Sequence, residues 1–380
     1  MVLDAIRRAK GLTRANLVAA TGLARGTIGL RLEQLEARNL IRVADGRETT
    51  GGRPAGFLTF NHQAGIILAA DIGSEHAFVG ITDLSGSILQ ELSAAIDAAE
   101  GPDSILDWLE AQFEILLRQG GHRADEIRGV GISVAAPVDH MTGRPMRPPI
   151  MPGWDGYDIA GRLGEKFNTS VSVDKDANLM ALAEQQLHYE DVRHMMFVKV
   201  ATGIGSGIVL SGRVHHGVDG AAGDIGHVPV PNGDTTICRC GNVGCLEAVA
   251  SGDAIARRLT EMGIPAKGPR DVLALLQAGD GDATRLVRES GRRIGEILVS
   301  AVNILNPELV VVGGDISRAN ELLLAGVRSV VYQRSLPLAT RRLRIVNSRL
   351  ENKAGLIGAA LMAIDRAMSP PNIDRLVSQV

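Results

Sequence analysis

The chain has 380 residues, of which 45% are hydrophobic and 22% are charged, and its formal net charge is −3. This composition is typical of globular proteins and excludes wholesale disorder, and the length predicts two or three domains. The 45 glycines follow no Gly-X-Y repeat, which excludes collagen. No run approaches the ~20 apolar residues that cross a bilayer, and the N-terminus does not resemble a signal peptide. We therefore expect a cytoplasmic protein with no membrane partner.

The N-terminal sixty residues are basic, whereas the rest of the chain is acidic. Residues 1–60 carry ten Lys/Arg and five Asp/Glu, and residues 61–380 carry 30 and 38. This asymmetry indicates that only the first segment meets a polyanion. Within it, Thr13 stands where an N-cap would precede a helix over residues 14–20, and residues 21–23 form a short turn. The next helix repeats apolar residues at helical spacing: Ile28, Leu32 and Leu35. Helix, short turn and helix predict a helix-turn-helix.

Two short strands around a polar tip follow, at residues 40–43 and 51–60, and they predict the wing of a winged helix. The second helix is expected to lie in the major groove of DNA, with the wing near phosphates or the minor groove. The side chains best placed to contact DNA are Arg25, Thr27 and Arg31 in the helix and Arg47 and Arg53 in the wing. The alternative is a helical dimerisation or docking module whose arginines are merely solvated.

From residue 61 onward, strands alternate with helices, which predicts an α/β body. Residues 66–82 and 196–210 echo each other, because each reads as a strand, a glycine-bearing turn and a second strand. Paired hairpins of this kind could clamp a phosphate chain with their backbone N–H groups. The alternative is two unrelated hairpins. A long helical pattern over residues 283–305 precedes a buried strand that ends in Gly313 and Gly314.

His227, Cys238, Cys240 and Cys245 form the strongest chemical signal in the chain. The cysteine spacing C-x-C-x4-C uses all three cysteines, and intervening glycines permit the tight wrap that aims the thiolates inward. Three Cys and one His complete a tetrahedral set, which predicts structural zinc and leaves no open position for a hydrolytic water. The alternative is three ordinary thiols near a loop.

Two segments, Gly220–His227 and Cys238–Glu247, resemble the signature of the ROK family of repressors, open reading frames of unknown role and sugar kinases. The helix-turn-helix and the sequence Gly51–Pro54 resemble the repressor branch of that family. The resemblance covers nearly the whole chain and implies an α/β, actin-like, two-lobed sugar-kinase fold behind the winged helix. It also implies zinc on the four residues named above, a sugar pocket between the lobes, and a homodimer or homotetramer.

The domain organisation implied by this resemblance has three parts. Residues 1–60 form the winged helix-turn-helix domain. Residues 61–185 together with residues 360–380 form the first lobe. Residues 186–359 form the second lobe, which carries the zinc site.

Five positions match residues that contact the sugar in this family: Lys175, Asp176, Asp224, His227 and Glu247. Asp176 matches the catalytic base of the kinases, which takes the sugar hydroxyl proton while ATP supplies the phosphoryl group. Asp224 stands where Glu is usual, and Lys175 and Ile150 each replace a usual Asn. An anionic ligand, such as a sugar phosphate or a sugar acid, would pair with Lys175. The alternative is that Lys175 pairs with Asp174 or Asp176.

The two phosphate loops of the kinases are unequally retained. Residues 202–207 keep the second loop, but residues 71–76 depart from the first, with Glu75 where the ATP phosphates would lie. At so short a distance, the Glu75 carboxylate and the ATP phosphates would repel each other in a partly desolvated cleft. We therefore predict a lost or crippled kinase that does not use Mg–ATP. The residues of this vestigial nucleotide site are Asp71, Gly73, Thr202, Gly203, Gly205, Gly313 and Gly314.

These features together favour a sugar-responsive transcription repressor of carbohydrate-metabolism genes that binds a palindromic, double-stranded operator. A ligand that closes the lobes would change the spacing of two winged helices in a dimer. The first alternative is an active ATP-dependent sugar kinase, with Asp176 as base and an appended DNA-binding domain. The second is a regulator controlled by a protein partner, with a vestigial pocket.

Overall fold

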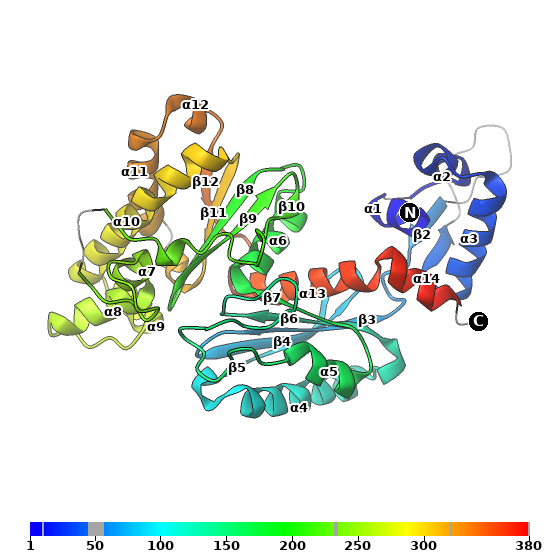
Figure 1. Ribbon diagram of the computed structural model, residues 1–380, viewed down its shortest axis with the longest axis horizontal. Helices are drawn as coiled ribbons and strands as arrows, with labels where there is room; N and C mark the ends of the chain where they lie inside the picture. The colour runs from blue at the N-terminus through cyan, green and yellow to red at the C-terminus, as the bar shows by residue number, and fades with distance from the viewer. Residues whose placement is uncertain (10, 45–56, 232–234, 320, 379–380) are drawn as a thin grey trace.

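Three units follow one another along the chain in the computed structural model (Figure 1). The structure describes residues 1–9, 11–44, 57–231, 235–319 and 321–378. A small helical domain comes first, and two lobes follow, each built on a five-stranded sheet. None of the helices within these ranges is long and apolar enough to cross a membrane. The predicted α/β class is confirmed.

The N-terminal domain consists of α1 (Val2–Arg8), α2 (Arg14–Thr21), α3 (Arg25–Ala37) and the antiparallel pair β1 (Ile41–Ala44) and β2 (Phe57–Phe60). The predicted cap is present, because the Thr13 hydroxyl accepts from the Asn16 N–H and the Asn16 side chain accepts from the Thr13 N–H. Gly22 ends α2 with a φ of +69°, which favours glycine. The predicted apolar face of α3 is buried, at Ile28, Leu32 and Leu35.

The first lobe has a sheet of order β5-β4-β3-β6-β7, in which β3, β4 and β5 are antiparallel and β6 and β7 are parallel to β3. Its strands are β3 (Ile66–Ile72), β4 (His76–Asp83), β5 (Ile88–Ala95), β6 (Ile127–Val134) and β7 (Val171–Lys175). α4 (Pro102–Gly120) and α5 (Ile159–Phe167) cover one face, and 3-10 turns lie at Ala98–Glu100 and Ala124–Glu126. Successive β3 residues point to opposite faces, so Leu68 packs toward α4 while Ala69 packs toward the helix on the other face.

The second lobe repeats this topology with the order β10-β9-β8-β11-β12. Its strands are β8 (Met195–Val200), β9 (Ile204–Leu210), β10 (Arg213–Val214), β11 (Leu309–Gly313) and β12 (Arg344–Asn347). Its helices are α7 (Leu246–Ala250), α8 (Gly252–Glu261), α9 (Pro269–Gln277), α10 (Gly281–Leu305), α11 (Glu321–Arg334) and α12 (Pro337–Thr340), with 3-10 turns at Ile225–His227, Asp315–Ala319 and Glu351–Lys353. The two predicted hairpins are therefore equivalent parts of two similar sheets, β3–β4 and β8–β9.

Two helices pass between the sheets, α6 (Asp176–His188) and α13 (Ala354–Ala367). They cross closely at Gly358, where a Cβ would collide with the Leu179 carbonyl of α6. Gly131 of β6 meets α13 and Gly207 of β9 meets α6 in the same way. Glycine at these positions lets the helices lie directly on both sheets.

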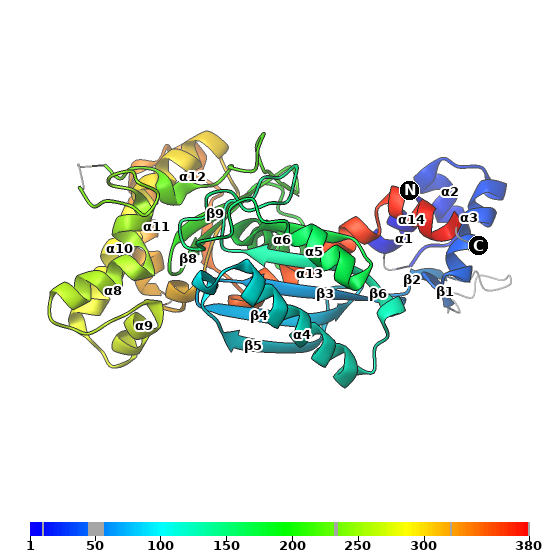
Figure 2. The same ribbon diagram turned by 60° about the horizontal axis from the view of Figure 1, so that its bottom comes forward.

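The last helix, α14 (Pro370–Ser378), packs against the N-terminal domain rather than against either sheet (Figure 1). Its Ile373 and Val377 are buried in the same apolar core as α1 and α3. An ion pair joins Arg7 to Asp365 of α13 at 3.1 Å, and another joins Arg31 to Asp374 of α14 at 3.3 Å. Figures 1 and 2 place this domain beside the first lobe and far from α8 and α9. Within residues 360–378, α13 thus contacts the first lobe and α14 contacts the N-terminal domain.

Candidate functional site: an interlobe cleft beside a metal centre

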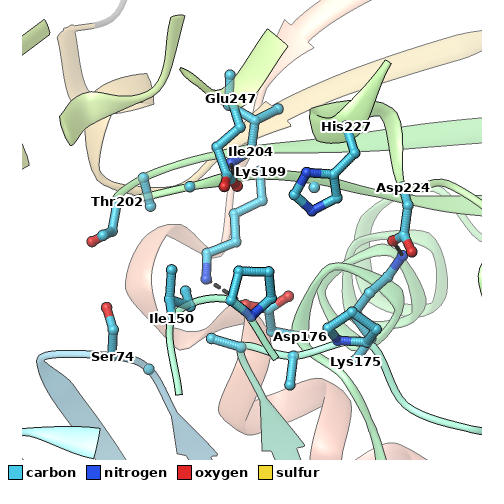
Figure 3. Close-up of a pocket in the computed structure, with 18 of the residues that line it drawn as sticks. Ser74, Ile150, Lys175, Asp176, Lys199, Thr202, Ile204, Asp224, His227 and Glu247 are labelled. Atoms are coloured by element: carbon cyan, nitrogen blue, oxygen red, sulfur yellow. Dashed lines mark hydrogen bonds and ion pairs between the residues drawn. The ribbon is translucent and has the colours of Figure 1, made fainter. Parts of the chain in front are cut away.

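Two adjoining cavities lie between the sheets, and both are lined by His76, Lys199 and Ala201. We call them the small cavity, with an empty volume of about 710 Å³, and the large cavity, with about 1660 Å³. All the predicted sugar-contacting residues line the small cavity: Lys175, Asp176, Asp224, His227 and Glu247. Ile150 lines it as well, and Figure 3 shows these side chains converging from both lobes.

Lys175 ends β7, and its ammonium pairs with Asp224 of the second lobe. The Nζ–Oδ1 distance is 2.8 Å, and Nζ also donates to the Ala222 carbonyl at 3.1 Å. Neither Asp174 nor Asp176 pairs with this ammonium, so the alternative partners weighed for Lys175 are wrong. The sequence favoured an anionic ligand because of the positive charge of Lys175, but the carboxylate of Asp224 balances that charge.

Asp176 is the first residue of α6, and each of its carboxylate oxygens accepts a hydrogen bond. Its Oδ1 accepts from the Ala177 N–H at 2.6 Å, and its Oδ2 accepts from the ammonium of Lys199. Burial by itself would lower the pKa of Lys199, but the carboxylates of Asp176 and Asp71 raise it above its ordinary value. Lys199 therefore stays charged. Sequence reasoning missed this residue, although a lysine inside the apolar strand 195–200 is itself a signal.

Asp71 lies on β3 with only 4% of its surface exposed. Its Oδ1 accepts from the Ser133 hydroxyl at 2.5 Å, and burial raises its pKa even though Lys199 opposes this shift. Asp315 also acts on the pKa of Lys199 and lines the large cavity. Lys199 thus pairs with Asp176, and it lines the large cavity together with two further acids, Asp71 and Asp315.

The glycine turns of the two hairpins are both covered by side chains of the chain itself. A Cβ on Gly73 would lie 2.9 Å from Cε1 of His76, so the imidazole packs on this turn. Burial lowers the pKa of His76. On the other hairpin, the Glu247 carboxylate covers Gly203, and its Oε2 accepts from the Ile204 N–H at 3.0 Å. Burial also raises the pKa of Glu247.

The predicted nucleotide residues are divided between the cavities. The small cavity is lined by Gly73, Thr202, Gly203 and Gly205, and the large cavity by Asp71 and Gly314. Gly313 lines neither, because it packs on the Phe197 ring. Glu75 is exposed and also lines neither cavity. The side chains inside the cleft near the first hairpin are therefore His76 and Lys199, not Glu75.

The structure brings His227, Cys238, Cys240 and Cys245 together, with their ligand atoms within 4.8 Å of one another. The sulfurs of Cys240 and Cys245 lie 3.7 Å apart, and the Cys238 sulfur lies 3.8 Å from His227 Nδ1. Zinc–sulfur bonds of about 2.3 Å would place tetrahedral sulfurs about 3.8 Å apart, so the cluster fits such an ion. This group could bind a metal.

The metal cluster lies next to the small cavity and is linked to two residues that line it, His227 and Glu247. The His227 ring belongs to the cluster and also lines the cavity (Figure 3). Cys245 immediately precedes α7, whose second residue is Glu247. A metal ion bound here would therefore fix the positions of two cavity residues at once.

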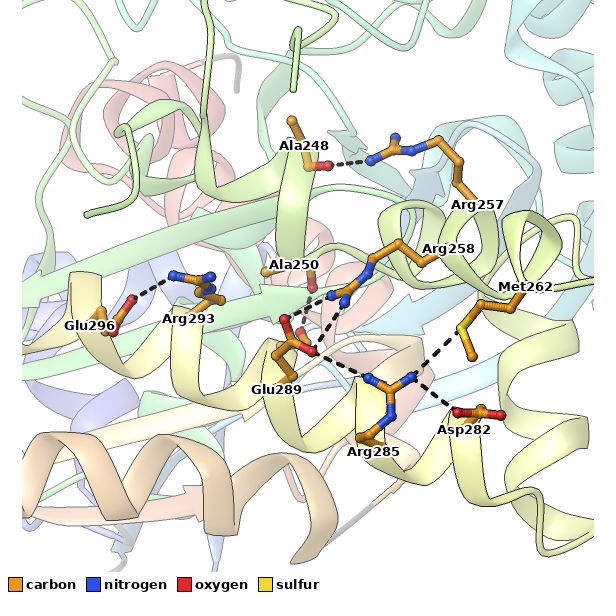
Figure 4. A network of polar contacts seen from close by, with 11 residues as sticks. Ala248, Ala250, Arg257, Arg258, Met262, Asp282, Arg285, Glu289, Arg293 and Glu296 are labelled. Carbon is orange, nitrogen blue, oxygen red and sulfur yellow. Dashed lines mark hydrogen bonds and ion pairs between the residues drawn. The ribbon is translucent and has the colours of Figure 1, made fainter. Parts of the chain in front are cut away.

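A network of polar contacts joins α7 and α8 to α10 (Figure 4). Arg258 of α8 donates to both carboxylate oxygens of Glu289 on α10, at 3.0 and 3.2 Å. The Ser290 hydroxyl donates to the carbonyl of Ala250, the last residue of α7, at 2.5 Å. The Ser290 contact ties α7, which carries Glu247, to α10, and the Arg258 pair ties the next helix, α8, to α10.

The predicted DNA-contacting residues of α3 are all exposed: Arg25, Thr27 and Arg31. Arg31 also donates to the Gln34 side chain at 3.2 Å. Arg47 and Arg53, predicted in the wing, lie outside the described residues. The structure thus presents one basic helix face at the end of the molecule opposite α8 and α9.

Comparisons with known proteins agree over nearly the whole chain. The ROK family profile matches residues 67–366. A putative xylose repressor of Caldicellulosiruptor sp. is 28% identical over 386 residues, covering 98% of this chain and 96% of the relative. A crystal structure of a ROK family transcriptional regulator, described as a homolog of the E. coli MLC protein, matches with a TM-score of 0.83 and 27% identity over 100% of this chain and 98% of that chain. A ROK hexokinase from Thermus thermophilus matches with a TM-score of 0.63 and 31% identity over 78% of this chain and 97% of the hexokinase.

Proposed function

The chain belongs to the ROK family, and from that premise we propose that it is a sugar-responsive DNA-binding transcriptional repressor of carbohydrate-metabolism genes. The observation that carries this proposal is the extent of the similarity. The repressor and the transcriptional regulator match at least 98% of this chain, whereas the hexokinase matches 78%. The N-terminal domain is thus shared with DNA-binding relatives.

We propose that the first turns of α3 recognise DNA. Arg25, Thr27 and Arg31 are exposed there and would contact base edges in the major groove. The wing arginines, Arg47 and Arg53, would add phosphate or minor-groove contacts. We infer that two copies, as a homodimer or within a homotetramer, bind the half-sites of a palindromic operator.

The effector is proposed to be a neutral sugar in the small cavity. The cleft lysines are each balanced by a carboxylate, so neither offers a free charge to an anionic ligand. Within the described ranges, Asp224 and Glu247 each use one oxygen in their hydrogen bonds, so the other can accept from a ligand hydroxyl. His227, Lys175 and Asp176 complete the polar lining.

The metal is proposed to be a structural zinc ion held by His227, Cys238, Cys240 and Cys245. Zinc would supply four bonds that fix the loop, because a complete ligand set leaves no position for a reactive water. The residues of this chain then do the binding: the loop presents His227 and Glu247 to the sugar.

A route from the cavity to DNA runs along α13 and α14. α13 begins beside Asp71, since a Cβ on Gly355 would collide with that carboxylate, and its other end contacts the N-terminal domain. A ligand that shifts the lobes would move α13, and α14 would carry the shift to α3. We propose lobes over residues 61–185 with 360–380 and over 186–359, behind a DNA-binding domain of residues 1–60. The coupling must be a difference in DNA affinity between ligand-free and ligand-bound states, typically worth ~1–3 kcal/mol.

An active sugar kinase is the second candidate, favoured by Asp176 at the start of α6 and by the glycine-bearing β8–β9 turn. In that case the protein would release ADP when given a sugar and Mg–ATP. A regulator controlled by a protein partner is the third candidate, and it predicts no response to any sugar.

The experiment that separates these candidates begins with selection of bound duplexes from a random DNA pool by the full-length, zinc-loaded protein. A variant carrying Arg25→Ala and Arg31→Ala serves as the control, because both side chains are exposed and their loss leaves the core intact. We expect a palindrome to be enriched by the natural protein only, with affinity that falls steeply with salt. Neutral sugars are then added to the selected duplex. Failure to enrich any sequence would overturn the proposed function.

A further inference from the structure

Lys199 lies at the junction of the two cavities and, like His76, lines both of them. It rises from β8 of the second lobe and points at the start of α6, where its ammonium contacts Asp176 (Figure 3). Its side chain is 15% exposed, and that of Asp176 is 9% exposed. This is a buried ion pair between the lobes, not a surface contact.

The fold family includes kinases, so the cleft must be tested for a nucleotide and its magnesium ion. Phosphoryl transfer needs a metal ion that neutralises the phosphates and a base that is free to accept the proton of the sugar hydroxyl. Here the base position, Asp176, accepts from Lys199 and from the Ala177 N–H. Asp71 and Asp315, two further acids, line the large cavity together with Lys199. The residues present do not fit a magnesium nucleotide.

We propose that Lys199 is a resident cation that supplies, beside the buried acids of the cleft, the positive charge that a divalent metal ion would otherwise supply, so that the cleft receives its ligand without nucleotide. The first part rests on the geometry alone. The second part, that the ligand is a sugar, rests on the proposed function.

Electrostatics explain why a cation is required at this point. Asp71 and Asp176 are both buried, at 4% and 6% exposure, and their charges would repel in a medium that screens poorly. A kinase can neutralise such acids with a metal that arrives with the nucleotide and leaves with the product. Here a lysine of the chain pairs with Asp176 and lines the same cavity as Asp71, and, unlike a metal ion, it cannot leave the site.

The first hairpin supports the same conclusion independently. Backbone N–H groups at a glycine turn bind phosphate only if the phosphate can approach them. The His76 ring packs on Gly73 and occupies that approach. A lysine thus pairs with Asp176 and an imidazole covers the glycine turn of the first hairpin, which leaves a site for the sugar alone.

Manganese, observed by electron paramagnetic resonance, is the probe for this inference, because Mn²⁺ takes the oxygen ligands of Mg²⁺. The full-length, zinc-loaded protein is titrated with Mn²⁺ in its natural form and as Lys199→Met and Lys199→Arg. We expect no Mn²⁺ site in the natural protein or in Lys199→Arg, which keeps the charge. Lys199→Met should gain one site, with binding at least tenfold tighter than any in the natural protein.

Lys175→Met is the matched control, because it removes a second buried lysine of the cleft that faces a carboxylate, Asp224. It should gain no Mn²⁺ site, since Asp71 and Asp176 remain neutralised by Lys199. Zinc content and the melting transition establish that each variant is folded. A folded Lys199→Met that gains no site would overturn the proposal, and so would a Mn²⁺ site in the natural protein that Asp71→Asn abolishes.

The natural protein provides a test even if Lys199→Met does not fold. Its melting temperature should be unchanged by a non-hydrolysable ATP analogue with Mg²⁺, and a rise of more than 2 °C would contradict the inference. None of these measurements uses DNA or sugar. A failure to bind DNA therefore overturns the proposed function and leaves the result for Lys199 standing.

Discussion

The two lobes have the same sheet, an antiparallel meander followed by two parallel strands, yet their hairpins hold different chemistry. In the first lobe, His76 covers the turn at Gly73. In the second, Glu247 covers the turn at Gly203 and takes up the Ile204 N–H. The strands are packed between buried cores on both of their faces, whereas His76 and Glu247 line the cavity between the lobes. The comparison teaches that two sheets of the same topology can carry different side chains on their glycine turns.

The lobes also differ in what they carry. The first lobe connects to the N-terminal domain through α13 and α14, and the second holds the candidate metal centre. Two ion pairs join the lobes, Lys175 with Asp224 and Asp176 with Lys199, and their first members are adjacent in the sequence. Because the two lobes carry different features, changes in one lobe should affect the proposed sugar and DNA binding unequally.

The largest expected effect comes from removing the metal, which tests the second lobe alone. Chelation, or Cys245→Ser, should lower the melting temperature by ~10 °C or more, because a structural metal contributes directly to folding. Ligand binding should be lost with it, since the loop carries His227 and Glu247. Calorimetry with metal analysis measures this. An unchanged melting temperature in fully metal-free protein would contradict a structural role.

A smaller effect is expected at the junction of the first lobe and the DNA-binding domain. Ile373→Ala removes a buried side chain that α14 contributes to the core of the N-terminal domain, at a cost of ~2–3 kcal/mol. DNA affinity should fall more than tenfold while sugar binding is retained, as measured by fluorescence anisotropy and calorimetry. Loss of both functions together would show that the two regions are not separable in this way.

The crossing of α6 and α13 is shared by both lobes, so a change there should affect them equally. Gly358→Ala forces a Cβ against the Leu179 carbonyl and should destabilise the protein by ~1–3 kcal/mol. The matched control is Gly29→Ala in α3, where a Cβ meets open space. There, the same substitution should stabilise by up to ~1 kcal/mol. Denaturant unfolding gives both values, and equal signs would refute this account of the crossing.

The smallest effect is the pH dependence that His76 imposes on the first hairpin. Because burial lowers the pKa of His76, the unfolded chain binds a proton more readily than the folded one. Stability is therefore fully present above the unfolded pKa of ~6.5 and declines as the pH falls below it, by ~1.4 kcal/mol for each unit of pKa difference. His76→Gln should flatten this slope in unfolding measured between pH 5 and 7. An identical slope in the variant would assign the effect to another group.

Much of this architecture was predictable from the sequence, because apolar runs and glycine turns are local signals. Cysteine spacing predicted a cluster that the structure brings within 4.8 Å. The partners of Lys175 and Asp176 were not predictable, since Asp224 and Lys199 lie 49 and 23 residues away along the chain. The packing of α14 on α3 carries no local signal, because the two helices lie at opposite ends of the sequence. Glu75 was expected in the cleft, but it lies at an exposed turn between two strands.

The most direct test of the central claim is the affinity of the full-length, zinc-loaded protein for its selected duplex. Fluorescence anisotropy would be measured with neutral sugars alone, with Mg–ATP alone and with both. The account predicts that one class of neutral sugar changes DNA affinity by ~5–150-fold and that Mg–ATP alters nothing in either case. A sugar effect that appears only with Mg–ATP, accompanied by release of ADP, would contradict it and restore the kinase.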